Sequence, residues 1–320
     1  MERPDLIYYA DDRPGITRRR AGRGWSYRAP DGTTIDDIAE RRRIEALAVP
    51  PAYADVWISP ERRGHLQATG VDDRSRKQYR YHPDWSAWRD AKKYDALPAF
   101  GEALPRIRRR IHAALGGEAG ERDFAIAAVL RLIDRTSLRV GSEDYRRENG
   151  TEGATTLRNR NLRLDRDRLR LDVRAKGGKR VRRQVSDRTL ARALHALADL
   201  PGAPVFTWRD GDEAHAVQAD HVNDWLRDAA GLAGATAKTF RTWNGSVAAL
   251  DAARRAGAGV TIKVMAEAAA DRLHNTPAIA RGSYIHPAVI ALAEEWRDVA
   301  APDGPDGLRL GERALLALIG

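Results

Sequence analysis

Short apolar runs separated by turn-forming residues fill the first ninety positions and predict a small domain built mainly of β-strands. One helix is expected to begin after Asp36, a good N-terminal cap, and to run to about Leu47, because Pro50 and Pro51 prevent it from continuing. The expected strands, which suit a meander, cover residues 6–10, 24–28, 33–35, 56–59, 65–69 and 77–81.

Further along the chain the apolar positions recur every three or four residues, which is typical of helices that bury one face. Phe124, Ala127, Ala128 and Leu132 form one such stripe. We therefore predict an α+β protein, with a β-rich domain over residues 1–90 and a larger, mainly α domain over residues 91–320 that carries a short antiparallel sheet. Helices are expected over residues 106–114, 123–133, 220–230, 239–255 and 260–274, after Ser186, after Pro287 and, as a capping helix, over 308–319.

The sheet of the larger domain is predicted from residues 154–185, where leucine or valine alternates with arginine. This period of two indicates antiparallel strands with one basic face, although Arg183 falls among the apolar positions. The run KGGK predicts a tight hairpin with Lys176 at its exposed tip, since paired glycines tolerate positive φ. A lysine at a hairpin tip usually only adds solubility, yet its long side chain can also reach into a DNA groove.

Charge points to an anionic partner. The chain of 320 residues has a net charge of +10, and residues 151–200 alone hold fourteen Lys and Arg against six Asp and Glu. Such a concentration is typical of proteins that bind nucleic acid, because neutralising phosphates releases condensed counterions. A solvated basic face is the alternative.

Composition excludes several kinds of chemistry. The absence of cysteine excludes disulfides, thiolate metal sites and cysteine nucleophiles. The eight histidines match no metal-binding spacing and no glycine-rich run has phosphate-loop spacing, so neither a metal nor ATP is expected. The longest apolar run is broken by Arg131 and is shorter than the roughly 20 residues that span a bilayer. The N-terminus lacks the apolar segment of a signal peptide, so we expect a cytoplasmic protein.

Tyr284 is the candidate nucleophile. A tyrosine in this setting is usually a core or rim residue, so its companions decide the interpretation. We expect it on the connection before the helix at Pro287, and loops on rigid scaffolds often carry chemistry. Two arginines, a lysine and an amide suit a pentacoordinate phosphate, and the chain offers Arg139, Lys176, Arg241 and Asn275. Arg241 is expected in the first turn of its helix, where the helix dipole also favours an anion.

A second basic run, over residues 76–81, alternates cationic or polar residues with aromatics. In a strand, Lys77, Tyr79 and Tyr81 share one face, and Arg76 and Gln78 lie with Arg80 on the other. Tyrosine can donate to phosphates and glutamine can read a base edge, so direct DNA contact is one interpretation. An amphipathic edge strand explains the same pattern equally well.

A family resemblance is carried by ordered motifs from about residue 50 to residue 287. The motifs GHLQATG, RSRKQYRYH, LRVGSEDYRRENGTEGATTL, RAKGGK, KTFRTW and NTPAIARGSY resemble those of bacterial type IB DNA topoisomerases, relatives of the compact poxvirus enzyme. The resemblance implies an enzyme that acts as a monomer around double-stranded DNA in the nucleoid. It would relax supercoils by cutting one strand, allowing rotation and resealing the strand, with no cofactor.

The resemblance also implies a role for each candidate. Tyr284 would form a 3′-phosphotyrosyl link and release a 5′-hydroxyl, Arg139 and Arg241 would bind the non-bridging oxygens, and Lys176 would protonate the leaving oxygen. Arg139 would also assist this proton transfer. Asn275 stands where the viral pattern has a histidine; its amide can donate a hydrogen bond to the phosphate but cannot act as a general base. The implied DNA-contact positions are Arg76, Lys77, Gln78, Tyr79, Tyr81, Tyr145 and Lys238.

Two other functions fit parts of the pattern. A tyrosine recombinase uses the same phosphoryl-transfer residues, but it typically has a histidine three residues before the second arginine, where this chain has Lys238. It also needs paired DNA sites and a multimer. A non-catalytic DNA-binding protein, in which Tyr284 only packs, is the second alternative.

Overall fold

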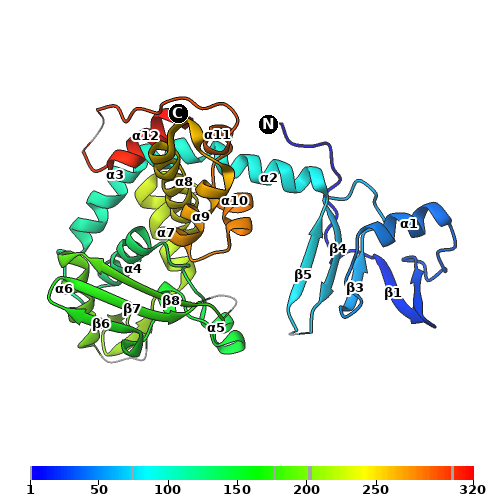
Figure 1. Cartoon of the computed structure of the whole chain (residues 1–320). Coiled ribbons are helices and arrows are strands. Elements are labelled where there is room, and N and C mark those ends of the chain that lie inside the picture. The colour runs from blue at the N-terminus through cyan, green and yellow to red at the C-terminus, as the bar shows by residue number, and fades with distance from the viewer. Residues whose placement is uncertain (1, 74, 176–177, 201–203, 304–305) are drawn as a thin grey trace. The chain divides into compact units, whose positions relative to one another are not determined.

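The computed structural model describes all residues except 1, 74, 176–177, 201–203 and 304–305. The chain forms two compact units, Met1–Lys93 and Tyr94–Gly320 (Figure 1). The division falls within helix α2 (Pro83–Asp95), which the sequence pattern did not predict. Among the described residues, no helix combines the length and the apolar character needed to cross a membrane.

The N-terminal unit is a five-stranded antiparallel sheet with one packed helix. The strand order is β2-β1-β3-β4-β5. Its strands are β1 (Ile16–Ala21), β2 (Gly24–Arg28), β3 (Ala54–Ile58), β4 (Leu66–Val71) and β5 (Lys77–Tyr81). Helix α1 (Ile38–Ala46) begins after Asp37, whose carboxylate accepts a hydrogen bond from the Glu40 amide at 2.8 Å. The buried core consists of Ile16, Tyr27, Ile44, Val56, Ile58 and Ala68.

Three expectations for this unit were wrong in detail, and one strand was not predicted. Strand β1 was missed because three of its six residues are arginines, and it forms by pairing with β2 on one side and β3 on the other. Residues 6–10 and 33–35 contribute only isolated bridges, at Ile7 and Thr34, rather than strands. The helix cap is Asp37 rather than Asp36.

The second unit is mainly helical. Helix α4 lies at its centre and contacts α3, α6, α7 and α8, so its side chains are buried almost all round. This explains the apolar run noted in the sequence. The helices are α3 (Leu97–Ala114), α4 (Arg122–Thr136), α5 (Glu143–Asn149), α6 (Arg188–Ala198), α7 (Ala219–Ala230), α8 (Ala237–Ala256), α9 (Ile262–Leu273), α10 (Pro277–Tyr284), α11 (Pro287–Ala291) and α12 (Leu310–Ile319).

A buried ion network holds the C-terminal helix in place. The Arg108 guanidinium lies 2.8 Å from the Asp134 carboxylate and 2.7 Å from that of Glu312, which is almost fully buried. Burial alone would raise the pKa of Asp134, but the charge and hydrogen bonds of Arg108, together with the charges of Arg309 and Arg135, lower it. The network ties α3, α4 and α12 together.

The three-stranded sheet has the predicted period and order. Its strands are β6 (Leu162–Asp165), β7 (Arg168–Arg174) and β8 (Arg180–Ser186), paired in the order β6-β7-β8. Leu169, Leu171 and Val173 are buried on the face that packs on α4 and α6, whereas the arginines of the other phase are exposed. The expected α+β fold is therefore confirmed. A second hairpin, β9 (Thr207–Asp210) and β10 (Glu213–Ala216), was not predicted.

Three local expectations in this unit were also wrong. Helix α6 is capped by Asp187 rather than Ser186, because the Asp187 carboxylate accepts from the Leu190 amide at 3.0 Å; it also pairs with Arg131 at 2.9 Å. Helix α8 begins two residues earlier than expected, which places Arg241 in its second turn. Tyr284 is the last residue of α10, not part of a connecting loop.

Candidate active site

The backbone of Tyr284 is fixed where α10 meets α8. Thr276 caps α10, with its side chain accepting from the Ile279 amide at 3.3 Å. At the other end, the Ser246 hydroxyl donates to the Tyr284 carbonyl at 3.2 Å. A Cβ on Gly245 would lie 2.8 Å from that same carbonyl oxygen, so the two helices approach this closely only because residue 245 has no side chain.

Arg241 is buried directly beside the nucleophile candidate. Its guanidinium carbon lies 5.0 Å from the Tyr284 ring centroid. One terminal nitrogen donates to the Ser137 carbonyl and the other to the Leu273 carbonyl at 3.2 Å. Within the part of the chain that the structure describes, the buried Nε of Arg241 has no hydrogen-bond partner. Buried donors without partners are costly, which is consistent with a site built to receive an anion.

Arg139 and Asn275 meet although 136 residues separate them. Nη2 of Arg139 donates to Oδ1 of Asn275 at 2.5 Å. The Arg139 loop follows the end of α4 and is held by the amide of Ala154, which donates to the Arg139 carbonyl at 2.8 Å. Asn275 follows α9 and is 7% exposed. Its Nδ2 is buried and lacks a partner among the described residues, so a second donor is available at the same site.

The cluster of cations alters the ionisation of the tyrosine. Burial would raise the pKa of the Tyr284 phenol, but the charge and hydrogen bond of Arg241, together with the charges of Arg139 and Lys238, lower the pKa below its ordinary value. Burial, reinforced by Arg139, lowers the pKa of Arg241 to about 10, so this guanidinium remains charged at neutral pH. The phenol of Tyr284 therefore loses its proton more easily than an ordinary tyrosine does.

The hairpin lysine cannot be placed, because Lys176 lies outside the described residues. The next lysine of the hairpin, Lys179, does reach the cluster, and its Nζ donates to the Asn275 carbonyl at 3.1 Å. The sequence pattern had given Lys179 no role. The second strand of the hairpin is thus attached to the segment that carries Asn275.

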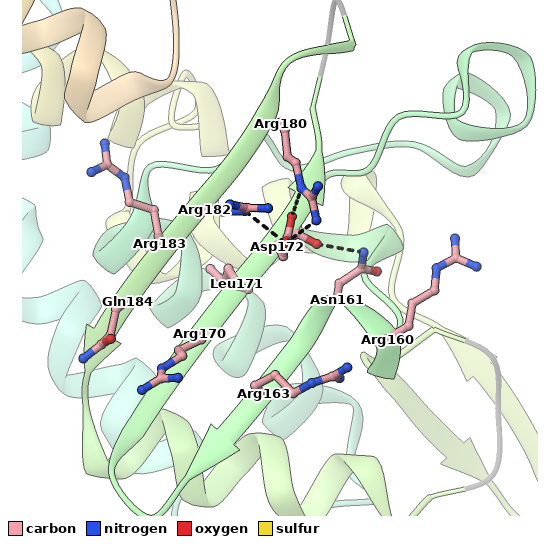
Figure 2. Close-up of a pocket in the computed structure, with 10 residues that line it drawn as sticks. All are labelled: Arg160, Asn161, Arg163, Arg170, Leu171, Asp172, Arg180, Arg182, Arg183 and Gln184. Carbon is pink, nitrogen blue, oxygen red and sulfur yellow. Dashed lines mark hydrogen bonds and ion pairs between the residues drawn. The ribbon is translucent and has the colours of Figure 1, made fainter.

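A basic groove lies on the outward face of the three-stranded sheet (Figure 2). It has a volume of about 680 Å³. Asp172 is the acidic residue of its lining, and it pairs with Arg180 at 2.7 Å and with Arg182 at 3.2 Å. The hydrogen bond from Arg180 lowers the pKa of Asp172, so the carboxylate is charged at neutral pH. The groove is lined by Arg160, Asn161, Arg163, Arg170, Leu171, Asp172, Arg180, Arg182, Arg183 and Gln184, a set with net positive charge.

The candidate DNA contacts of the N-terminal unit lie along β5. Tyr79 and Tyr81 are stacked with ring centroids 6.1 Å apart, and they are 49% and 38% exposed. Lys77 lies on the same face and pairs with an aspartate, Asp11, at 2.6 Å. The other two candidates, Arg76 and Gln78, both bond to Asp72, at 2.7 and 3.0 Å. The stacked tyrosines are the apolar surface of this strand that remains open to solvent.

The structure thus brings four of the five catalytic candidates to one place: Arg139, Arg241, Asn275 and Tyr284. Lys238 is exposed and near enough to influence the phenol electrostatically, whereas Tyr145 lies on α5 and is half-buried. Sequence reasoning missed the supporting pair Gly245 and Ser246. The signal available was their position in the same helix, one residue beyond the end of the motif KTFRTW.

A buried tyrosine beside two arginines and an amide, with two donors that have no partner among the described residues, is an arrangement suited to binding an anion such as a phosphate. Comparisons with known proteins are consistent with such a site. The family model described as bacterial DNA topoisomerase IB, N-terminal domain, matches residues 24–72, and that of the eukaryotic DNA topoisomerase I catalytic core matches residues 81–276. The chain belongs to the type IB DNA topoisomerase family.

One similar protein is the DNA topoisomerase 1B of Acanthamoeba polyphaga mimivirus. The two sequences are 25% identical over 210 residues, a region that covers 66% of this chain and 62% of the viral protein. The match therefore spans less than two thirds of the relative's length. The resemblance seen in the motifs is confirmed at the level of the family.

Proposed function

We propose that this protein is a type IB DNA topoisomerase that relaxes supercoiled double-stranded DNA through a covalent tyrosine intermediate. The observation that carries the proposal is the convergence of Arg139, Arg241 and Asn275 beside Tyr284, with Nε of Arg241 and Nδ2 of Asn275 left without partners among the described residues. A non-bridging phosphate oxygen is an acceptor that would satisfy both donors. Preorganised donors of this kind stabilise charge that develops in a transition state.

In the proposed cleavage step, the Tyr284 oxygen attacks the phosphorus of a backbone phosphodiester. A bond from phosphorus to the phenolic oxygen forms, and the bond from phosphorus to the 5′ oxygen breaks. The phenol proton leaves to water, which the lowered pKa of Tyr284 favours. The leaving 5′ oxygen takes a proton from Lys176, with Arg139 assisting. Arg139 and Arg241 bind the non-bridging oxygens throughout.

Resealing reverses these steps. One phosphodiester replaces another, so the exchange requires neither ATP nor a metal ion. Torsion in the DNA drives rotation of the cut strand between cleavage and resealing. The free 5′-hydroxyl attacks the phosphotyrosine and returns its proton to the lysine. Asn275 contributes a hydrogen bond and no proton transfer, since its amide does not ionise.

DNA binding is proposed to involve both units of a single chain around one duplex. The outward arginines of β6, β7 and β8 offer positive charge to the phosphate backbone, and Tyr79 and Tyr81 offer exposed aromatic surface. Lys238 and Tyr145 are further proposed contacts in the C-terminal unit, and Arg76, Lys77 and Gln78 in the N-terminal unit. Such a protein acts on the nucleoid in the cytoplasm.

Relaxation of a supercoiled plasmid tests the proposal. The purified protein should relax both positive and negative supercoils in the presence of a chelator and without ATP, and Tyr284→Phe should abolish relaxation while DNA binding persists. Tyr8→Phe, at a tyrosine that is 59% exposed and far from the site in sequence, is the matched control and should retain activity. Retained relaxation by Tyr284→Phe would remove the nucleophile assignment, and exchange of strands between duplexes would favour a recombinase instead.

A further inference from the structure

Arg183 breaks the alternation of its strand. In the β7–β8 ladder it pairs with the buried Leu171, so it occupies the phase of Val181 and Val185 rather than that of the exposed arginines. Figure 2 shows its side chain directed away from the cluster around Asp172, past the edge of the sheet. A charged residue in an apolar phase needs partners beyond its own sheet.

The partners of Arg183 lie at the C-terminal end of α9. One terminal nitrogen donates to the Asp271 carbonyl and lies 3.2 Å from the Asp271 carboxylate. The same nitrogen lies 3.4 Å from Nδ1 of His274, whose Nε2 is 3.2 Å from the Thr136 carbonyl. Nε of Arg183 also lies 3.5 Å from Nε2 of His274, so the guanidinium contacts both nitrogens of the imidazole ring. A cation at this end of a helix also interacts favourably with the helix dipole.

His274 is a neutral ring in this arrangement. Burial, reinforced by the charge of Arg183, lowers the pKa of His274 to about 4. His274 also ends α9 in the left-handed conformation, with φ at 56°, and so sets the direction in which the chain leaves the helix. The residue that follows is Asn275.

The hairpin is therefore attached to the segment around Asn275 at two points. Arg183 binds the last turn of α9, and Lys179, four residues earlier in the chain, binds the Asn275 carbonyl. Lys176 precedes Lys179 by three residues in the sequence. The two attachments link the strand that leads back to the proposed general acid to the residue that is proposed to bind the phosphate.

We propose that Arg183 is a positioning residue for strand cleavage: it anchors the β7–β8 hairpin on the end of α9, beside the segment that carries Asn275, and is thereby required for the step in which the leaving 5′ oxygen takes its proton. This inference rests on the proposed function. Arg183 has a different role if it only stabilises the end of α9. In that case its loss would slow cleavage equally whether or not the leaving group needs a proton.

The experiment compares cleavage of two DNA substrates at saturating protein, one with the ordinary 5′ oxygen at the cut and one with a 5′ sulfur. The sulfur leaves without needing a proton, so it reports on cleavage without the general acid. Arg183→Ala is measured beside Arg227→Ala, which removes an arginine of similar exposure, 37% against 31%, that also pairs with an aspartate. Arg183→Lys keeps one donor for the Asp271 carbonyl. Thermal unfolding of each variant establishes that it is folded.

Arg183→Ala should cleave the oxygen substrate about 10- to 100-fold more slowly than the wild type, because misplacement by about 1 Å can cost about 100-fold. The loss should shrink to less than about 3-fold on the sulfur substrate, with Arg183→Lys intermediate and Arg227→Ala unchanged on both. Equal losses on the two substrates, or no loss, would overturn the inference. If Arg183→Ala does not fold, the same comparison is made with Arg183→Lys. Absence of cleavage by the wild type would instead defeat the proposed function.

Discussion

The sharpest test of the phosphate site is Asn275→Asp compared with Asn275→Ala. Aspartate has nearly the same shape as asparagine and keeps the oxygen that accepts from Arg139 at 2.5 Å. It replaces the Nδ2 donor, which has no partner in the described part of the chain, with a second oxygen that shares the negative charge. The pair of variants therefore separates two roles of Asn275, namely holding Arg139 and donating to the phosphate.

The expected magnitudes follow from these contacts. A hydrogen bond to a charged group contributes about 1.5–3 kcal/mol, so its loss in Asn275→Ala should slow cleavage about 10- to 150-fold. A carboxylate about 4 Å from a phosphate charge costs about 4 kcal/mol at an effective dielectric constant near 20, which corresponds to a further factor of up to about 1000. The aspartate would also draw Arg139 away from the phosphate. Asn275→Asp should thus be the slower variant by at least about tenfold.

The assay is single-turnover formation of the covalent adduct at saturating protein, so that differences in DNA affinity do not enter. Thermal unfolding provides the control for folding of both variants. Aspartate as active as asparagine, or more active than alanine, would refute donation to the phosphate and leave Asn275 only as a support for Arg139.

Three further outcomes are expected. Glu312→Gln should lower the free energy of unfolding by about 3 kcal/mol in denaturant titrations, because it weakens a buried ion network in which a second carboxylate still binds the same guanidinium. Gly245→Ala should slow cleavage more than it lowers the unfolding temperature, since its Cβ would displace the Tyr284 carbonyl. The pKa of His274 is lower in the folded protein than in the unfolded chain, so its contribution to stability is complete above pH 6.5 and should be lost as pH falls from 6.5 to about 4. Unfolding measured against pH for the wild type and for His274→Asn, which tolerates the left-handed conformation, should reveal this loss as a difference between the two curves.

Matched variants provide the controls for these outcomes. Glu267→Gln removes a carboxylate that is 54% exposed and should change the free energy of unfolding by less than about 0.5 kcal/mol. A Cβ on Gly259 would meet nothing within 4 Å, so Gly259→Ala should leave cleavage unchanged. A loss at Glu267 as large as that at Glu312, or equal slowing by both alanine variants, would contradict the structural reasoning. So would identical pH curves for the wild type and His274→Asn.

Local patterns in the sequence predicted the elements whose own residues decide their structure. The alternation of leucine and arginine over residues 162–174 predicted β6 and β7, because one face of this sheet is buried and a shift by one residue would expose it. Strand β1 escaped prediction because its pairing with two neighbours, rather than its arginine-rich sequence, makes it a strand. Arg183 was an anomaly in sequence since its partners, at the end of α9, are some ninety residues away.

In the site, too, the sequence predicted the residues but not the contacts that the fold creates between them. The identities of Arg139, Arg241 and Tyr284 were predicted from motifs, whereas the contact between Arg139 and Asn275 depends on how α4 and α9 end beside each other. The location of Tyr284 at the end of a helix was missed, because Pro287 suggested a loop before it. Its placement requires the close approach of α8 at Gly245, which only the folded structure reveals.

Identification of the covalent link between protein and DNA tests the central claim most directly. The protein is mixed with DNA labelled at either end, denatured and digested, and the modified peptide is identified by mass spectrometry. Tyr284 should carry the 3′ phosphate, so the label at the 5′ end of the cut strand should remain with the protein while the downstream fragment is released with a 5′-hydroxyl. A link to another residue, a link to the 5′ end, or no link at all would contradict the account.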